Sequence, residues 1–173
     1  MLCLANLRIQ KNHFLLLDVA EKLKECHPDW TFHLVGKDFN DNYSKQIKEL
    51  LLSRNLDKNV YIYGSKNDIN NIIQQADIAI LSSQSEGLPV AILEYGLSKK
   101  PVVSTEVGEI PLIIKNGING FLVPKYDKDK FCESLVRLIE NETLRTVIGS
   151  KLNEIILENH SENAIIESYL NWI

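Results

Sequence analysis

The chain has 173 residues, of which 45% are hydrophobic and 24% charged, and its formal net charge at neutral pH is −4. This length suits one domain with its own core and leaves little room for two, so we expect a single domain over residues 1–173. The acidic balance argues against a nucleic-acid partner held by bulk electrostatics, although a few local basic residues are enough to bind one phosphate group.

Apolar runs of strand length alternate with segments of helical period along the chain. A strand is expected at residues 2–5, followed by a helix whose apolar positions recur up to Leu23 and which ends before Pro28. Next come a strand at residues 31–35, a helix at 43–53, a strand at 60–63, a short helix at 68–75 with Asp68 as its N-cap, and a strand at 78–81. A helix at 89–97, a strand at 101–104, a short helix at 110–114 and a strand at 120–123 precede three amphipathic helices at 128–140, 142–157 and 162–172.

This alternation predicts an α/β fold, a Rossmann-like parallel sheet with helices on both faces. Residues 78–81 form an apolar run without alternation, which is typical of a strand covered on both faces. Ligands of such sheets bind beyond the carboxyl ends of the strands, at helix N-termini.

The three cysteines, Cys3, Cys26 and Cys132, are few, odd in number and far apart, which predicts reduced thiols rather than a disulfide framework. The histidines are scattered, without a metal-ligand spacing. No stretch approaches the roughly 20 apolar residues of a membrane-spanning helix, and the start is too soon polar for a signal peptide. We expect a cytoplasmic protein without a metal site, with a membrane role only through a partner or at the bilayer surface.

The densest chemical signal is ILSSQSEGLPVAILEYGLSKKPVVST, residues 80–105. A strand ends near Leu81, a polar loop follows and a helix opens at Pro89, whose first turn offers backbone N–H groups to a phosphate. Gly87 lets a ligand approach the backbone. Glu86 and Glu94 flank the turn, about 10–12 Å apart at ~1.5 Å of rise per residue. They suit a ligand with hydroxyls at both ends and phosphates between them; alternatively, both only stabilise the helix or face solvent.

Residues 85–111, SEGLPVAILEYGLSKKPVVSTEVGEIP, resemble the donor-site motif of retaining glycosyltransferases of family 4, which have the GT-B fold. That motif has two glutamates separated by seven residues, a helix end of small residues and a Pro-Val-Val strand. Glu86, Gly87, Glu94, Gly96 and residues 101–103 match it. The resemblance covers nearly the whole chain through further segments in the same order: NLRIQKNHFLLLDVAEKL, FHLVGKD, VYIYGS, QQADIAILSS and NGINGFLVP.

The resemblance implies that the chain is the C-terminal, donor-binding half of a GT-B fold. On this resemblance the N-terminal acceptor-binding domain would be absent, and the chain would be an excised domain or one half of a split enzyme. Glu86 would lie beside the donor sugar, and Glu94 would bind the nucleotide ribose. The helix at residues 162–172 would brace the acceptor domain, with Tyr169 and Trp172 as apolar surface toward it.

The resemblance implies four further donor-binding residues. The backbone amides near Gly87 and Leu88 would contact the sugar and the pyrophosphate. The loop around Gly64 and Ser65 would border the base.

Two positions depart from the family pattern. The family neutralises the diphosphate with an arginine and a lysine five residues apart; Lys11 matches the lysine, but Asn6 stands at the arginine position. Arg8 is the candidate to replace the arginine, in a different register; alternatively, Lys11 and Arg8 are solvated loop cations. The loop after the strand at 101–104 also differs, and Glu109 is given no role.

The implied activity is retaining transfer of a hexose from a UDP- or GDP-sugar to an acceptor such as a growing polysaccharide or a lipid-linked glycan, with no cofactor or metal. Glu86 and Lys11 would be the catalytic residues, and the leaving diphosphate would be stabilised electrostatically. The chain alone would be inactive, and its partners would be the donor and an acceptor domain or chain that associates peripherally with the inner membrane surface. A non-catalytic nucleotide-sugar-binding module is the main alternative; a sugar-nucleotide epimerase stays open, and a phosphorylase lacks its pyridoxal-phosphate region.

Overall fold

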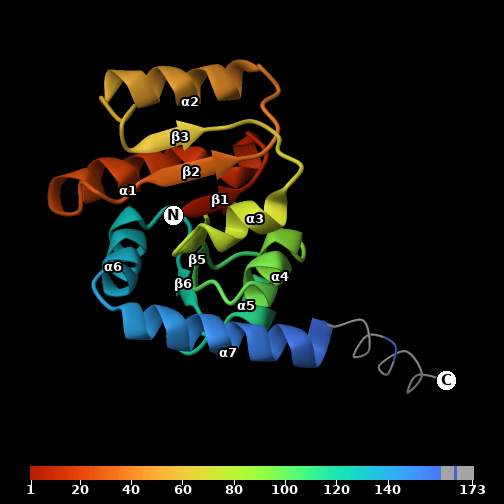
Figure 1. Ribbon diagram of the computed structural model, residues 1–173. Helices are drawn as coiled ribbons and strands as arrows, with labels where there is room; N and C mark the ends of the chain where they lie inside the picture. The colour runs from red at the N-terminus through yellow and green to blue at the C-terminus, as the bar shows by residue number, and fades with distance from the viewer. Residues whose placement is uncertain (161–165, 167–173) are drawn as a thin grey trace.

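A computed structural model describes residues 1–160 and residue 166 (Figure 1). Its sheet has six strands: β1 (Leu2–Leu4), β2 (Phe32–Val35), β3 (Val60–Ile62), β4 (Ala79–Leu81), β5 (Val102–Thr105) and β6 (Phe121–Val123). They lie in the order β3-β2-β1-β4-β5-β6, and each pairs in parallel with its neighbours. The predicted Rossmann-like parallel sheet is therefore confirmed.

The helices are α1 (His13–Cys26), α2 (Asn42–Ser53), α3 (Ile69–Gln74), α4 (Val90–Leu97), α5 (Ile110–Ile113), α6 (Lys128–Ile139) and α7 (Glu142–His160), with a 3-10 turn, η1, at Ile9–Lys11. Aspartates cap three of them: Asp41 accepts from the Ser44 backbone N–H, Asp68 from Asn71 and Asp127 from Lys130. The predicted cap at Asp68 is thus confirmed.

Two apolar clusters lie on opposite faces of the sheet, because successive strand residues point to opposite sides. The cluster that includes Cys3 of β1 contains residues of α1, α2 and α6 together with Ile148 of α7, whereas the cluster that includes the neighbouring Leu2 contains residues of α3, α4, α5 and α7. On the second face α4 and α7 cross closely: a Cβ added at Gly96 would lie 2.5 Å from Ile156 Cγ1. Helices therefore cover both faces, as the apolar run at β4 predicted.

Several boundaries differ from the sequence expectation. Residue 5 does not belong to β1, and α4 begins at Val90, with Pro89 at its N-cap rather than inside its first turn. The turn η1 was not expected, because three residues are too few to show a helical period. The expected helix at 162–172, with Tyr169 and Trp172, lies outside the described residues.

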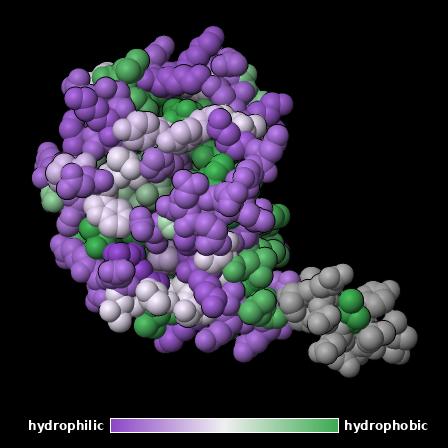
Figure 2. Space-filling view, viewed as in Figure 1, coloured by the Kyte–Doolittle hydropathy of each residue, from purple (hydrophilic) through white to green (hydrophobic). Residues whose placement is uncertain are grey.

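The face of the molecule in Figure 2 is mainly hydrophilic, with hydrophobic side chains scattered over it. Isolated exposed apolar side chains, such as Leu52 on α2, are normal for a folded protein. Across the part of the chain that the structure describes, no helix has both the length and the apolar character to cross a membrane.

Candidate functional site

The site lies where the strand order reverses, between β1 and β4. From β1 the chain next builds β2 on one side, whereas β4 pairs on its other side and is followed by β5. The segments that leave the carboxyl ends of β1 and β4 therefore diverge and open a crevice. Residues 5–11 follow β1, and residues 82–89 follow β4 and lead into α4.

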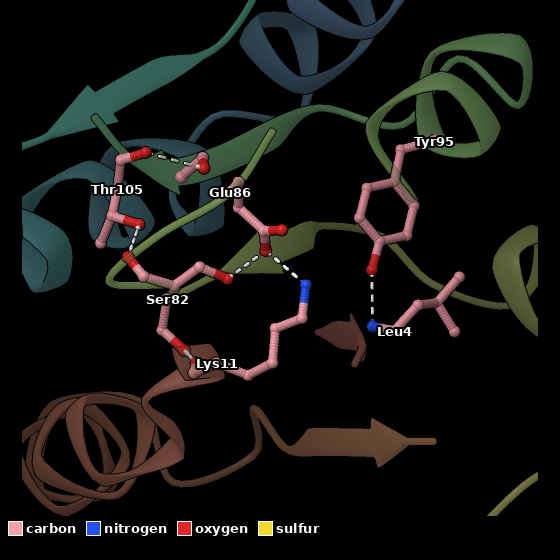
Figure 3. Close-up of polar contacts among 8 residues, drawn as sticks. Leu4, Lys11, Ser82, Glu86, Tyr95 and Thr105 are labelled. Atoms are coloured by element: carbon pink, nitrogen blue, oxygen red, sulfur yellow. Dashed lines mark hydrogen bonds and ion pairs between the residues drawn. The ribbon is translucent and has the colours of Figure 1, made fainter. Parts of the chain in front are cut away.

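An ion pair joins these two segments (Figure 3). Lys11 Nζ lies 2.5 Å from Glu86 Oε1, and Ser83 Oγ donates to the same oxygen at 2.5 Å. The Glu86 side chain is only 9% exposed, and that of Lys11 is 23% exposed. Both contacts are to Oε1, and Glu86 Oε2 has no hydrogen-bond partner among the described residues. The carboxylate is thus fixed through one oxygen, and the other is left to accept a hydrogen bond.

Buried hydroxyl groups hold the loop that carries Glu86. Ser82 Oγ donates to the Lys11 carbonyl at 2.8 Å, and Thr105 Oγ1, on β5, donates to the Ser83 carbonyl at 2.6 Å (Figure 3). The Gln84 backbone N–H donates to the Gln10 carbonyl at 2.8 Å. Buried polar groups bonded in this way fix the loop before any ligand arrives.

Two glycines allow backbone segments to meet at the site. Gly36, at the end of β2, lies so close to the loop after β1 that an added Cβ would be 2.2 Å from the Ala5 carbonyl oxygen. Gly108 has a φ of +56°, and its added Cβ would be 1.9 Å from the Glu86 carbonyl oxygen. Both positions therefore require glycine.

A cavity of about 370 Å³ lies beside the ion pair. Its lining includes Asn6, Lys11, Lys37, Ser65, Lys66 and Glu94. Glu94 is on α4, where burial raises the pKa of its carboxyl group above the usual range. The cavity thus combines cationic walls, a carboxylate and the N-terminus of an eight-residue helix.

Tyr95 ties α4 to the central strand. Its side chain is fully buried, and its hydroxyl accepts a hydrogen bond of 2.7 Å from the Leu4 backbone N–H (Figure 3). Burial raises the pKa of Tyr95 well above its usual range, so the hydroxyl stays neutral. The neighbouring Glu94 is therefore held on a helix that is bonded directly to β1.

The predicted site residues do not all lie together. Glu86, Lys11, Ser65 and Glu94 line the cavity or adjoin it. Gly87 and Leu88 stand between Glu86 and α4, both exposed, and Gly64 has a φ of +69° just before Ser65; none of these three is in the cavity lining.

Arg8, the candidate to replace the missing arginine, is exposed in the segment that follows β1. Its guanidinium lies over the Phe39 ring, 4.6 Å from the centroid, and Arg8 is not among the residues that line the cavity. The arrangement is a cation–π contact at an exposed site.

Another cavity, of about 560 Å³, lies by α3 and is lined by Trp30, His33 and Ile72 among others. It contains neither Glu86 nor Glu94, and its size alone does not make it the functional site. Among residues 1–160 and residue 166, no three His, Cys, Asp or Glu side chains gather as a set of metal ligands.

A family model described as "Glycosyl transferases group 1" matches residues 1–154. The chain belongs to this family. A poly(ribitol-phosphate) alpha-N-acetylglucosaminyltransferase of Staphylococcus aureus is 28% identical over 158 residues, which are 91% of this chain and 31% of that protein. A UDP-Gal:alpha-D-GlcNAc-diphosphoundecaprenol alpha-1,3-galactosyltransferase of Escherichia coli is 30% identical over 154 residues, 85% of this chain and 38% of that protein.

The fold is that of a known C-terminal domain. The crystal structure of the C-terminal domain of a glycosyl transferase group 1 family protein (LpcC) from Francisella tularensis superposes with a TM-score of 0.84 and 24% identity, covering 93% of this chain and 86% of that one. The present glycosyl transferase group 1 chain therefore has the fold of the C-terminal half of a GT-B enzyme. It spans about a third of the length of the two curated relatives above.

Sequence reasoning missed several residues of this candidate site. Ser83, which donates to Glu86, was read only as part of a polar loop, although a serine three residues before a glutamate at the end of a buried strand is a recognisable signal. Lys37 and Lys66 follow the carboxyl ends of β2 and β3, and the rule that ligands bind there would have selected them.

His13 is a buried titratable group at the start of α1, two residues after Lys11. Its backbone N–H donates to the Tyr43 hydroxyl at 2.7 Å, and its ring Nδ1 lies 3.1 Å from the same hydroxyl. Its Nε2 has no hydrogen-bond partner among the described residues. Burial lowers the pKa of His13 to about 4 from the ordinary 6.5. The imidazole is therefore neutral in the folded protein at neutral pH.

The stability of the domain should consequently fall in mild acid. Between pH 6.5 and pH 4 the unfolded chain binds a proton at His13 that the folded chain does not, so this contribution is complete above pH 6.5 and lost as pH falls to 4. We expect His13 to lower the free energy of unfolding by about 2 kcal/mol between pH 7 and pH 5. Urea unfolding at the two pH values should show a smaller difference in His13→Leu. The control His160→Leu should keep the wild-type difference; equal differences in all three proteins would contradict the assignment.

Proposed function

We propose that this chain is the donor-binding domain of a retaining glycosyltransferase, which binds a nucleoside-diphosphate hexose for transfer to a growing polysaccharide or a lipid-linked glycan. The observation that carries the proposal is the position of Glu94, Lys11 and the fixed Glu86 carboxylate around one crevice at the strand-order reversal. A nucleotide sugar needs acceptors for two sets of hydroxyls and positive potential for the phosphates between them. The crevice offers both.

Each residue has a role in this proposal. Glu94 accepts hydrogen bonds from the ribose hydroxyls, and the Glu86 carboxylate accepts one from the donor sugar through Oε2. The backbone amides of Gly87 and Leu88 contact the sugar and the pyrophosphate, while Gly64 and Ser65 border the base. These assignments rest on the resemblance of residues 85–111 to the donor motif and on the cavity lining.

Transfer breaks the bond between the anomeric carbon and the diphosphate oxygen, which leaves with the electron pair. The oxygen of an acceptor hydroxyl bonds to that carbon on the same face, and the proton of the hydroxyl passes to the departing diphosphate. The negative charge that develops on the departing diphosphate is stabilised by Lys11 and by the N-terminus of α4. Lys11 is already placed by its bond to Glu86, so little reorganisation is needed when the charge appears. We expect no metal or cofactor.

UDP is the first nucleotide to test, because the name of the Escherichia coli relative includes a UDP-sugar donor. GDP is the second. The acceptor would be held by an N-terminal domain or a partner chain, as the one-third coverage of the curated relatives supports. We place the reaction in the cytoplasm, with peripheral association at the inner membrane surface through that domain.

The experiment that tests the proposal is calorimetric titration of the chain with UDP, GDP and their common hexose conjugates, with Glu94→Ala beside the wild type. We expect one nucleotide family to bind, and Glu94→Ala to weaken it about tenfold or more, the cost of one charge-assisted hydrogen-bonding partner. Absence of binding by a folded sample at millimolar nucleotide would contradict the proposal. Binding without activity once an acceptor domain is supplied would favour a non-catalytic binding module.

Gly87→Ala separates ligand approach from folding. A Cβ added at Gly87 meets no atom within 4 Å, so we expect the free energy of unfolding to change by no more than about 0.5 kcal/mol. A donor that contacts the backbone here would meet the new methyl group, and the nucleotide-sugar affinity should fall about tenfold. Urea unfolding and calorimetry measure the two quantities, with the exposed Ser85→Ala on the same loop as the control. Unchanged affinity would place the donor elsewhere.

A further inference from the structure

Lys11 alone does not give the cavity enough positive charge to match a nucleoside diphosphate. Lys11 is the cation that matches the family pattern, but its ammonium is paired with Glu86, and the pair is neutral as a unit. Glu94 adds a negative charge to the same cavity. A nucleoside diphosphate carries at least two negative charges, so further cations must face it for the site to be electrostatically complementary.

Asn6, at the position of the family's arginine, supplies no charge but holds another residue in place. The Lys37 backbone N–H donates to Asn6 Oδ1 at 2.7 Å, and the Leu7 backbone N–H donates to the Lys37 carbonyl at 2.9 Å. Gly36, just before Lys37, is packed against Ala5. Both the N–H and the carbonyl group of Lys37 are therefore hydrogen-bonded to the segment between β1 and Lys11.

Lys37 lines the cavity and Arg8 does not, although both cations lie over the same Phe39 ring. Lys37 Nζ is 5.0 Å from the ring centroid. Within the described part of the chain, Lys37 forms no ion pair with a carboxylate, so its charge is not neutralised by one. The same holds for Lys66, but Lys66 follows Ser65, at the end of the cavity that we assign to the base.

We infer that Lys37 binds the donor diphosphate in place of the missing arginine, and that Asn6 is a positioning residue that fixes the Lys37 backbone. In this assignment, the positive charge that the family pattern places in the loop after β1 is supplied here from the loop after β2. Without a ligand, the Lys37 ammonium lies over the Phe39 ring. This inference rests on the proposed function, because it assigns one residue to the diphosphate of that donor.

The test compares the binding of UDP, UMP, GDP and GMP to the wild type, Lys37→Met, Arg8→Met and Lys58→Met by calorimetry. Lys58 is exposed and precedes the amino end of β3, whereas the site is at the carboxyl ends of the strands, and its substitution makes the same change in net charge. For the nucleoside diphosphate that binds, Lys37→Met should lose about tenfold in affinity, and the loss should shrink in high salt. The affinity of Lys37→Met for the corresponding nucleoside monophosphate should fall by a smaller factor. Arg8→Met and Lys58→Met should bind like the wild type.

A second variant keeps folding effects apart from charge effects. Asn6→Arg added to Lys37→Met returns a cation to the family's position and should recover the affinity for the nucleoside diphosphate, which a merely structural loss would not allow. If the wild type binds but Lys37→Met equals Lys58→Met, this inference is wrong while the proposed function stands. A loss confined to Arg8→Met would assign the charge to Arg8 instead. If the folded wild type binds neither diphosphate, the proposed function and this inference fall together.

Discussion

Replacing Gly108 with alanine is expected to lower the free energy of unfolding by about 3–5 kcal/mol and to abolish nucleotide binding. The added Cβ would lie 1.9 Å from the Glu86 carbonyl oxygen, and the φ of +56° is itself unfavourable for alanine. Because the Cβ meets backbone rather than a flexible side chain, the loop that carries Glu86 must move. That movement would separate Glu86 from Lys11. Urea unfolding and nucleotide titration measure the two consequences.

Gly117→Ala is the matched control. Its φ is +75°, but an added Cβ there meets no atom within 4 Å. The left-handed backbone should cost about 1–2 kcal/mol, and nucleotide binding should be unchanged. The difference between the two variants therefore measures the contact with Glu86. Equal losses of stability in Gly108→Ala and Gly117→Ala would contradict the close packing described here.

Lys11→Met is expected to lower the free energy of unfolding by about 2–4 kcal/mol and to reduce nucleoside-diphosphate affinity beyond measurement at millimolar concentration. The methionine keeps the apolar stem but removes the ammonium. It leaves the Glu86 carboxylate, only 9% exposed, with Ser83 as its remaining partner. An uncompensated charge in that position is costly, because desolvation is no longer offset by the pair. Urea unfolding and calorimetry are the measurements.

Two further variants test whether loss of the Lys11–Glu86 ion pair causes the loss of stability in Lys11→Met. Glu86→Gln in the Lys11→Met background should recover part of the lost stability, because a neutral amide has no charge to desolvate. Lys22→Met breaks the exposed pair with Asp129 and should leave stability unchanged within error. A double variant less stable than Lys11→Met, or an equal loss in Lys22→Met, would contradict the role assigned to the pair.

The fold could be predicted from the sequence because it depends on local patterns. The apolar runs that became β4 and β5 and the aspartate cap at Asp68 are local signals, and the alternation of strands and helices implies a parallel sheet. Boundaries were less accurate: Pro89 was placed inside α4, but its φ of −76° and ψ of 119° are extended, so it precedes the helix.

The chemistry of the site was only partly predictable, since its contacts join distant parts of the chain. Lys11 and Glu86 are 75 positions apart, and each was selected by resemblance, but no pattern could show that they neutralise one another. Arg8 was selected because it is close in sequence to Asn6, but its contact with the Phe39 ring could not be read from the sequence. The place of Lys37 after a strand is visible in the sequence, but its link to Asn6 exists only once β1 and β2 pair.

The central claim is that a nucleoside diphosphate binds in the crevice between β1 and β4, and amide chemical-shift mapping tests it most directly. The isotopically labelled chain is titrated with UDP and, separately, with GDP. We predict that one of them shifts the amide resonances of residues 6–11, 36–37, 64–66, 86–88 and 90–94, and that Lys58 and its neighbours stay unchanged. Shifts centred on His33 and Ile72, around the larger cavity, would contradict the claim, as would an unchanged spectrum of folded protein at millimolar nucleotide.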